Sequence, residues 1–219
     1  MRYLALILLA SLTLSSATRD RVYGDSWAIV IGINEYNDDK LSDLNYAVND
    51  AEAVSRMLVE RFGFKSENVQ VLLDGDATRS NITSALEIMS GKTKKNDRVL
   101  FFFAGHGETK KNPAGGDTGY IIPVDGDKSR LYSTCIPMKD LDAISDMYSA
   151  KHMLFLIDAC YSGLATMNTR GGLDTSVPGY IDKVTRDDSR VVITAGSKGE
   201  EAIEKAEWGN SAFTKNLIN

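Results

Sequence analysis

The sequence predicts an α/β fold with a mostly parallel central sheet and helices on both faces. Apolar runs of strand length alternate along the chain with segments in which apolar residues recur at helical spacing. Strands that alternate with helices are joined by right-handed crossovers, which make the strands parallel and place the helices over the sheet. The chain has 219 residues, of which 43% are hydrophobic and 25% are charged. That length and composition are typical of one globular domain with a sizeable core.

Three strands and two helices are predicted in the first half of the chain. The strands are nearly continuous apolar runs, typical of strands buried on both faces. They cover residues 27–33, 69–73 and 98–104. The first helix covers residues 47–62 and ends at Gly63. Thr78 can cap the second predicted helix, which ends at Gly91.

The second half of the chain continues the pattern. A helix is predicted over residues 139–148, and strands over residues 152–157 and 190–195. Between these two strands lies a segment, residues 164–189, that is rich in Gly, Thr, Asp and Ser. Long loops of this kind are often functional. No G-x-G-x-x-G or P-loop pattern follows any strand, which argues against an ordinary doubly wound domain that binds a small ligand through a phosphate-cradling loop.

Two scarce residue types lie where the chemistry of a parallel sheet gathers, at the carboxyl ends of the strands. The chain has two histidines and two cysteines. His106 follows the strand over residues 98–104, and Cys160 follows the strand over residues 152–157. If the two strands are neighbours, both side chains reach the same edge of the sheet. A cysteine beside a histidine is the minimal nucleophilic pair, because the thiolate attacks while the imidazole transfers protons.

Five motifs surround these residues, in order, within residues 26–219. They read AIVIGINEY from Ala28, Asn49-Asp50-Ala51, Gly105-His106-Gly107, YIIPVD from Tyr120 and DACYSG from Asp158. His106 precedes Cys160 by about the 50 residues that are typical of caspases. In this combination the sequence resembles the caspase-like peptidase family, and within it the metacaspase and bacterial orthocaspase branch. The resemblance implies a caspase-like three-layer sandwich.

The resemblance also implies a cysteine endopeptidase. Cys160 would be the nucleophile, His106 its proton-transfer partner, and the backbone amides of Gly107 and Cys160 the oxyanion hole. This chemistry needs no cofactor, so we expect none. Many metacaspases are activated by calcium through an acidic cluster before the helix near residue 139, but this sequence lacks that acidic pair. We therefore expect calcium independence and no metal site. The alternative is a non-catalytic caspase-like protein-binding module, although members of that kind typically lose the Cys or the His.

Two acidic residues indicate a substrate preference. Asp158 replaces the Gln of the caspase Q-A-C motif, and by resemblance Asp50 matches the second acid of the metacaspase primary pocket. Two carboxylates in a partly dry pocket favour Arg or Lys, so we expect cleavage after basic residues. Simpler roles remain open, with Asp158 orienting its loop and Asp50 placed at a helix start. Ala104 departs from the family, in which many metacaspases carry a Ser that helps the pocket.

The segment over residues 164–189 matches the linker that caspase relatives cut during activation. It contains Arg170, Lys183 and Arg186, and a preference for basic residues makes each a candidate self-processing site, with Arg170 favoured. The alternative is an ordinary surface loop. We expect the peptidase domain over residues 18–219, either minimal or truncated at its C-terminus, because family members continue beyond this point.

The first 17 residues have the layout of a secretory signal peptide. Arg2 precedes a short apolar run, and small residues lead up to Ala17. If this signal peptide is cleaved off, we expect a secreted or periplasmic protein without membrane attachment. The alternative is an uncleaved membrane anchor. The net charge of −5 argues against nucleic-acid binding. We expect a monomer that acts on protein or peptide substrates with Arg or Lys at the cleavage site.

Overall fold

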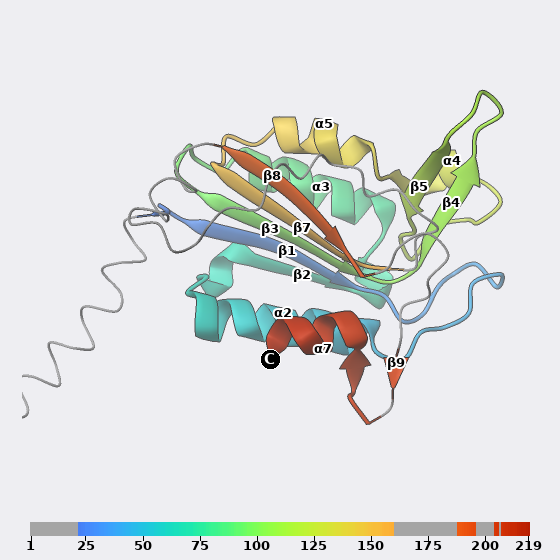
Figure 1. Ribbon diagram of the computed structural model, residues 1–219, viewed down its shortest axis with the longest axis horizontal. Coiled ribbons are helices and arrows are strands. Elements are labelled where there is room, and N and C mark those ends of the chain that lie inside the picture. The colour runs from blue at the N-terminus through green and yellow to red at the C-terminus, as the bar shows by residue number, and fades with distance from the viewer. Residues whose placement is uncertain (1–21, 160–187, 196–203, 206) are drawn as a thin grey trace, which may run out of the picture.

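In the part of the chain that the structure describes, the central sheet has five parallel strands in the order β2-β1-β3-β7-β8 (Figure 1). The computed structural model describes residues 22–159, 188–195, 204–205 and 207–219. The strands are β1 Ser26–Gly32, β2 Val69–Leu73, β3 Arg98–Ala104, β7 His152–Asp158 and β8 Ser189–Thr194. All five predicted strands are thus confirmed within a residue at either end. Ser189, which the prediction assigned to the linker, instead begins β8.

Helices cover both faces of this sheet, which makes the predicted three-layer sandwich (Figure 1). Helices α2 (Ala47–Phe62) and α7 (Ala212–Ile218) lie on one face, and α3 (Arg79–Ser90) and α5 (Asp140–Asp146) on the other. Gly63 ends α2 in a left-handed conformation with φ 71°, and Thr78 caps α3 by accepting a hydrogen bond from the amide of Asn81. The helix predicted over residues 139–148 is shorter, because only the seven residues of α5 are helical.

A second, antiparallel sheet extends from the end of β3 and was not predicted. It contains β4 (Gly107–Lys111), β5 (Asp117–Ile121) and β6 (Ile136–Pro137), and a short helix α4 (Leu131–Thr134) precedes β6. Two further short strands, β9 (Glu204–Lys205) and β10 (Asn210–Ser211), pair with each other just before α7. Short 3-10 helices cover Ser66–Asn68 and Asp74–Asp76. Figure 1 shows β4 and β5 on the side of α3 and α5, and β9 beside α7.

The core lies on both sides of the central sheet because successive residues of β3 point to opposite faces. Phe101 and Phe103 pack with α3 and α5, whereas Phe102 packs with α2. The end of β1 approaches α2 closely at Gly32, where a Cβ atom would lie only 2.4 Å from the carbonyl oxygen of Ala47. A glycine is therefore required at this contact. None of the helices in the described ranges is long and apolar enough to cross a membrane.

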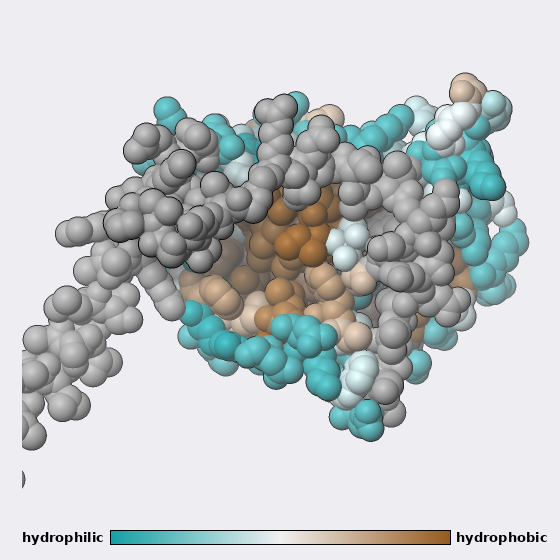
Figure 2. All heavy atoms as spheres, in the orientation of Figure 1, coloured by the Kyte–Doolittle hydropathy of each residue, from teal (hydrophilic) through white to brown (hydrophobic). Residues whose placement is uncertain are grey.

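An apolar groove of about 470 Å³ remains at the end of the sheet opposite the predicted site, between α2, α7 and the last strands. Leu154, Val191 and Leu217 are among its lining residues, and apolar side chains are visible at the centre of Figure 2. The predicted signal peptide (residues 1–17) lies outside the described residues, as do Cys160, Arg170, Lys183 and Arg186. Their predicted roles therefore remain predictions.

Candidate active site

His106 lies at the carboxyl edge of the sheet, two residues after β3 ends. Strand β7 is the direct neighbour of β3, which is the condition that the sequence analysis set, and Ala104 pairs with Asp158 at the ends of the two strands. The amide of Gly105 donates to the carbonyl of Asp158 at 3.2 Å, so the two strand ends stay together beyond the sheet. His106 follows Ala104 by two residues, and Cys160 follows Asp158 by two residues.

The imidazole of His106 is held by a carbonyl group. Its Nε2 lies 2.7 Å from the carbonyl oxygen of Ser42, in the loop between β1 and α2. A carbonyl oxygen can only accept a hydrogen bond, so this contact places the hydrogen on Nε2. In the neutral imidazole, the other ring nitrogen, Nδ1, then has a lone pair that can take a proton from a nucleophile. The contact with Ser42 is thus compatible with the tautomer that a general base needs.

The backbone of His106 is held by the same loop. Its amide donates to the hydroxyl of Tyr36 at 2.7 Å, and the two rings pack with centroids 4.9 Å apart. The sequence analysis identified Tyr36 only as part of a motif and did not identify Ser42. No local sequence signal marks either residue as a partner of His106, because the contacts are made across 70 and 64 residues of chain.

Gly107 begins β4, with its amide directed away from β5. Gly107 pairs with Ile121, while the amide of Ile122 donates to the carbonyl of His106. This is the non-hydrogen-bonded type of antiparallel pair, in which the amides of the two opposed residues face away from each other's strand. The orientation meets one requirement of an oxyanion-hole donor next to His106.

The two predicted pocket acids come together around Ser211. Asp50 lies in the first turn of α2 and Asp158 at the end of β7, with only 1% and 4% of their surfaces exposed. The amide of Ser211 donates to Asp50 at 3.1 Å, and its hydroxyl donates to Oδ2 of Asp158. Asn210 adds a hydrogen bond to Asp50 at 2.8 Å, and the hydroxyl of Thr214 adds one to Asp158 at 3.0 Å. The carboxylate of Asp50 therefore faces the start of α7.

These two carboxylates lack a positive partner among the described residues. Burial and, to a smaller extent, the nearby Asp158 raise the pKa of Asp50 to about 7, although hydrogen bonds from Asn210 and Ser211 act in the opposite direction. Burial also raises the pKa of Asp158, although bonds from Ser211 and Thr214 act in the opposite direction. Within the described ranges, Oδ1 of Asp158 is buried and has no hydrogen-bond partner. A cationic group would stabilise this pair of acids.

The sequence analysis missed three residues of this cluster: Asn210, Ser211 and Thr214. One signal was available, since Ser211 stands directly before an apolar helical segment, as an N-cap does. That pattern predicts a helix start but not the acids that it meets. Among the described residues, no group of three or more His, Cys, Asp or Glu side chains is suited to hold a metal ion.

A family model for the caspase domain matches residues 25–219. The chain belongs to the caspase domain family. This caspase domain is similar to metacaspase-1 of Schizosaccharomyces pombe, with 28% identity over 68% of this chain and 38% of that protein. It is 30% identical to metacaspase-1A of Neurospora crassa over 62% of this chain and 31% of that protein. The chain spans about a third of the length of these curated relatives.

Solved structures share the fold of this caspase domain. A crystal structure of a protein from Geobacter sulfurreducens matches with a TM-score of 0.64 and 21% identity, over 89% of this chain and 80% of that chain. Caspase-1 from Spodoptera frugiperda matches with a TM-score of 0.55 and 16% identity, over 88% of this chain and 67% of that chain. The resemblance to caspases and metacaspases, and the caspase-like α/β fold, are confirmed.

Proposed function

We propose that the protein is a cysteine endopeptidase in which Cys160 is the nucleophile and His106 transfers protons. The observation that carries the proposal is the register of β3 and β7. Because Ala104 and Asp158 are paired neighbours, the two strands end at the same level of the sheet, each two residues before a candidate catalytic residue. Those residues are His106 and Cys160. Membership in the caspase domain family supports the same assignment.

The observed hydrogen bonds fit the steps of peptide hydrolysis. Nδ1 of His106 takes the proton of the Cys160 thiol, and the thiolate attacks the carbonyl carbon of the scissile bond. The oxyanion that forms is stabilised by the amides of Gly107 and Cys160. His106 then gives the proton to the departing amine, which leaves a thioester on Cys160. Water, deprotonated by His106, hydrolyses this thioester and frees the enzyme.

We further propose that the substrate residue before the scissile bond is Arg or Lys. The support is the buried pair of acids, Asp50 and Asp158. Asp158 precedes the proposed nucleophile by two residues in the sequence. The unpartnered Oδ1 of Asp158 offers an acceptor to a guanidinium or ammonium group. An aspartyl side chain would bring a third carboxylate to two buried ones, which is strongly unfavourable.

Paired fluorogenic peptides that differ only in Arg, Lys or Asp before the cleaved bond test both proposals. Arg and Lys peptides should be cleaved, and Cys160→Ala should abolish cleavage. Cys135→Ala is the matched control, because the Cys135 side chain is buried in the cluster around Ile122 and Leu131. Faster cleavage of the Asp peptide would reject the acidic pocket. Equal cleavage by wild type and Cys160→Ala would reject the nucleophile.

Self-processing and export remain proposals about residues outside the described ranges. A protease with this preference is expected to cut its own chain after Arg170, with Lys183 and Arg186 as the other candidates. Intact-mass measurement of wild type and Arg170→Ala checks this, since only wild type should yield a fragment that ends at residue 170. Sequencing the N-terminus of exported protein tests the signal peptide, which predicts a start at Thr18.

A further inference from the structure

The loop between β1 and α2, residues 33–46, contacts His106 at two different atoms. The hydroxyl of Tyr36 accepts from the backbone amide of His106, and the carbonyl of Ser42 lies 2.7 Å from its Nε2. The Tyr36 contact restrains the backbone of His106, and the Ser42 contact restrains the far end of its imidazole ring. Packing and supporting hydrogen bonds of this kind lock the orientation of a functional side chain.

We propose that Tyr36 is a positioning residue for His106. Its hydroxyl holds the backbone of His106 where the carbonyl of Ser42 can reach Nε2, which leaves Nδ1 as the ring nitrogen that can accept a proton. Tyr36 touches no reacting atom in this scheme and acts only through the histidine. The inference rests on the proposed role of His106 and adds the residue that sets its geometry.

The packing around Tyr36 makes its hydroxyl position specific. At Gly105 a Cβ atom would lie 2.6 Å from the Tyr36 hydroxyl oxygen, so only glycine permits this approach. The ring packs against both the main core and a smaller cluster that includes Leu41 and Tyr120. Burial raises the pKa of Tyr36, so the phenol stays neutral and its oxygen accepts the amide hydrogen at any working pH.

The loop is anchored on its inner side by Asp74. One carboxylate oxygen of Asp74 accepts from the amides of Asn34 at 2.7 Å and Glu35 at 3.2 Å, immediately before Tyr36. Asp74 itself adopts φ 39°, a left-handed conformation that is unfavourable for a residue with a side chain. Strained residues of this kind cluster where the surrounding structure needs a defined geometry.

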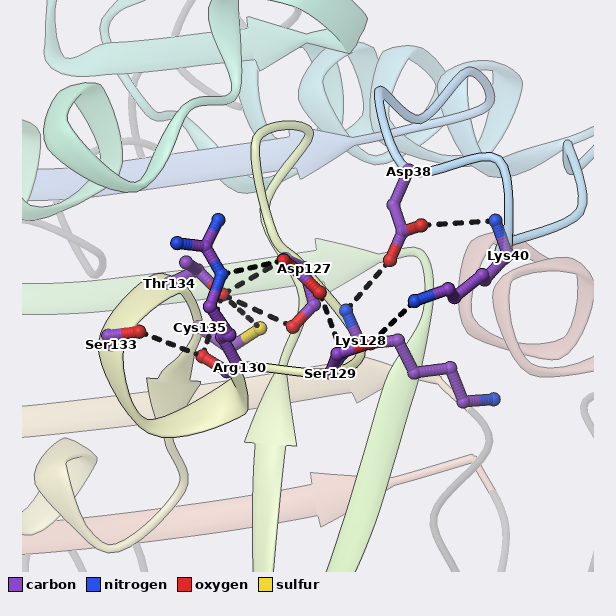
Figure 3. A network of polar contacts seen from close by, with 9 residues as sticks. All are labelled: Asp38, Lys40, Asp127, Lys128, Ser129, Arg130, Ser133, Thr134 and Cys135. Atoms are coloured by element: carbon purple, nitrogen blue, oxygen red, sulfur yellow. Dashed lines mark hydrogen bonds and ion pairs between the residues drawn. The ribbon is translucent and has the colours of Figure 1, made fainter.

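The outer side of the loop is anchored to the segment between β5 and β6 (Figure 3). Oδ2 of Asp38 accepts from the amide of Lys128 at 2.8 Å, and the ammonium group of Lys40 donates to Ser129 at 2.6 Å. Asp127 in turn holds that segment through the amide of Ser129 and an ion pair with Arg130. These contacts lie between Tyr36 and Ser42 along the chain, so they restrain both partners of His106.

Replacing Tyr36 by Phe tests the proposal, since it removes the hydroxyl and keeps the ring. The matched control is Tyr148→Phe, which removes another phenol hydrogen bond, from Tyr148, two residues after α5 ends, to the carbonyl of Leu86 in α3 at 2.8 Å. Both variants should lose a similar amount of thermal stability. Tyr36→Phe alone should lower kcat by roughly 3- to 10-fold with KM unchanged, as expected for one lost hydrogen bond. Equal kcat in the two variants would overturn the proposal.

A readout without activity separates this proposal from the proposed function. The chain has two histidines, so nitrogen NMR can resolve the imidazoles of His106 and His152. Wild type and Tyr148→Phe should show the His106 tautomer with its hydrogen on Nε2, and Tyr36→Phe should show a mixture of tautomers, with His152 unchanged. An unaltered His106 signal in Tyr36→Phe would reject the positioning role. If wild type cleaves no peptide while the tautomer still shifts, the peptidase proposal fails and the positioning role stands.

Discussion

The hydroxyl of Ser211 donates a hydrogen bond to the carboxylate of Asp158, 53 residues earlier in the chain. The same Ser211 oxygen accepts from the amide of Thr214 at 3.0 Å and so caps α7. One side chain therefore starts a helix and completes a buried acidic cluster. Because the amide of Ser211 also bonds to Asp50, the position of the two acids depends on how α7 begins.

Ser211→Ala should lower kcat/KM for Arg peptides by a larger free-energy equivalent than it lowers the free energy of unfolding. Loss of the N-cap costs about 1 kcal/mol of unfolding free energy, and loss of a hydrogen bond to a charged group costs about 1.5–3 kcal/mol, or roughly 10- to 100-fold in kcat/KM. Thr78→Ala is the matched control, because it removes the N-cap of α3 on the other face of the sheet. Equal kcat/KM in the two variants would separate Ser211 from the pocket.

The pH dependence of Arg cleavage should reflect Asp50. Its pKa in the free enzyme is about 7, and protonation removes a charge that the guanidinium needs, so kcat/KM should fall as pH drops through about 7. Bound arginine favours the ionised form, so the corresponding fall in kcat should occur at lower pH. Rate profiles for both constants check this. Coincident profiles for kcat and kcat/KM would contradict an acid of raised pKa in the pocket.

Asp50→Asn should lower the cleavage of Arg peptides and, above pH 7, raise the stability of the folded protein. The folded-state pKa of Asp50 lies above its ordinary value of 3.8, so the folded protein binds this proton more tightly than the unfolded chain. The stabilising contribution is complete below about pH 4 and is lost as pH rises towards about 7. Thermal melts should therefore show the variant more stable than wild type above pH 7 and similar to it near pH 4. Asp142→Asn, at an exposed position on α5, should show no such pH-dependent difference.

Ala104→Ser should strengthen the acidic pocket. Ala104 is buried and pairs with Asp158 on the neighbouring parallel strand, so a hydroxyl there lies on the same face as a carboxylate oxygen that lacks a partner. The new hydrogen bond is expected to raise kcat/KM for Arg peptides roughly fivefold, from about 1 kcal/mol. Ala28→Ser places a hydroxyl in the same core layer on β1, without an acid beside it. If both variants only lose stability, no acceptor is accessible at Asp158.

The sequence predicted the sheet well because its strands are buried on both faces. Val99 to Phe103, for example, form an uninterrupted apolar run, and all five residues are buried. A run without polar residues is what a strand covered on both faces requires. Strand β4 was missed for the opposite reason. Its residues, Gly107–Lys111, are polar and partly exposed, and β4 forms because β5 pairs with it. Strand pairing of this kind comes from tertiary structure and leaves little local signal.

Only those residues of the candidate site that belong to sequence motifs were predicted. His106, Asp50 and Asp158 belong to recognisable motifs, and the structure places them along one edge of the sheet. Ser211 and Tyr36 were missed because their contacts span 53 to 161 residues of chain. Such contacts follow from the docking of α7 on α2 and of a loop on His106. Neither docking event leaves a spacing pattern in the sequence.

The most direct test of the central claim is labelling with a chloromethyl ketone that carries an arginyl side chain, followed by peptide mass spectrometry. The reagent should alkylate Cys160 and leave Cys135 unmodified, because Cys135 is fully buried. His106→Ala and Asp158→Asn should each slow the labelling. An aspartyl chloromethyl ketone that labels Cys160 faster than the arginyl reagent, or an arginyl reagent that labels both cysteines equally, would contradict a nucleophile beside an acidic pocket.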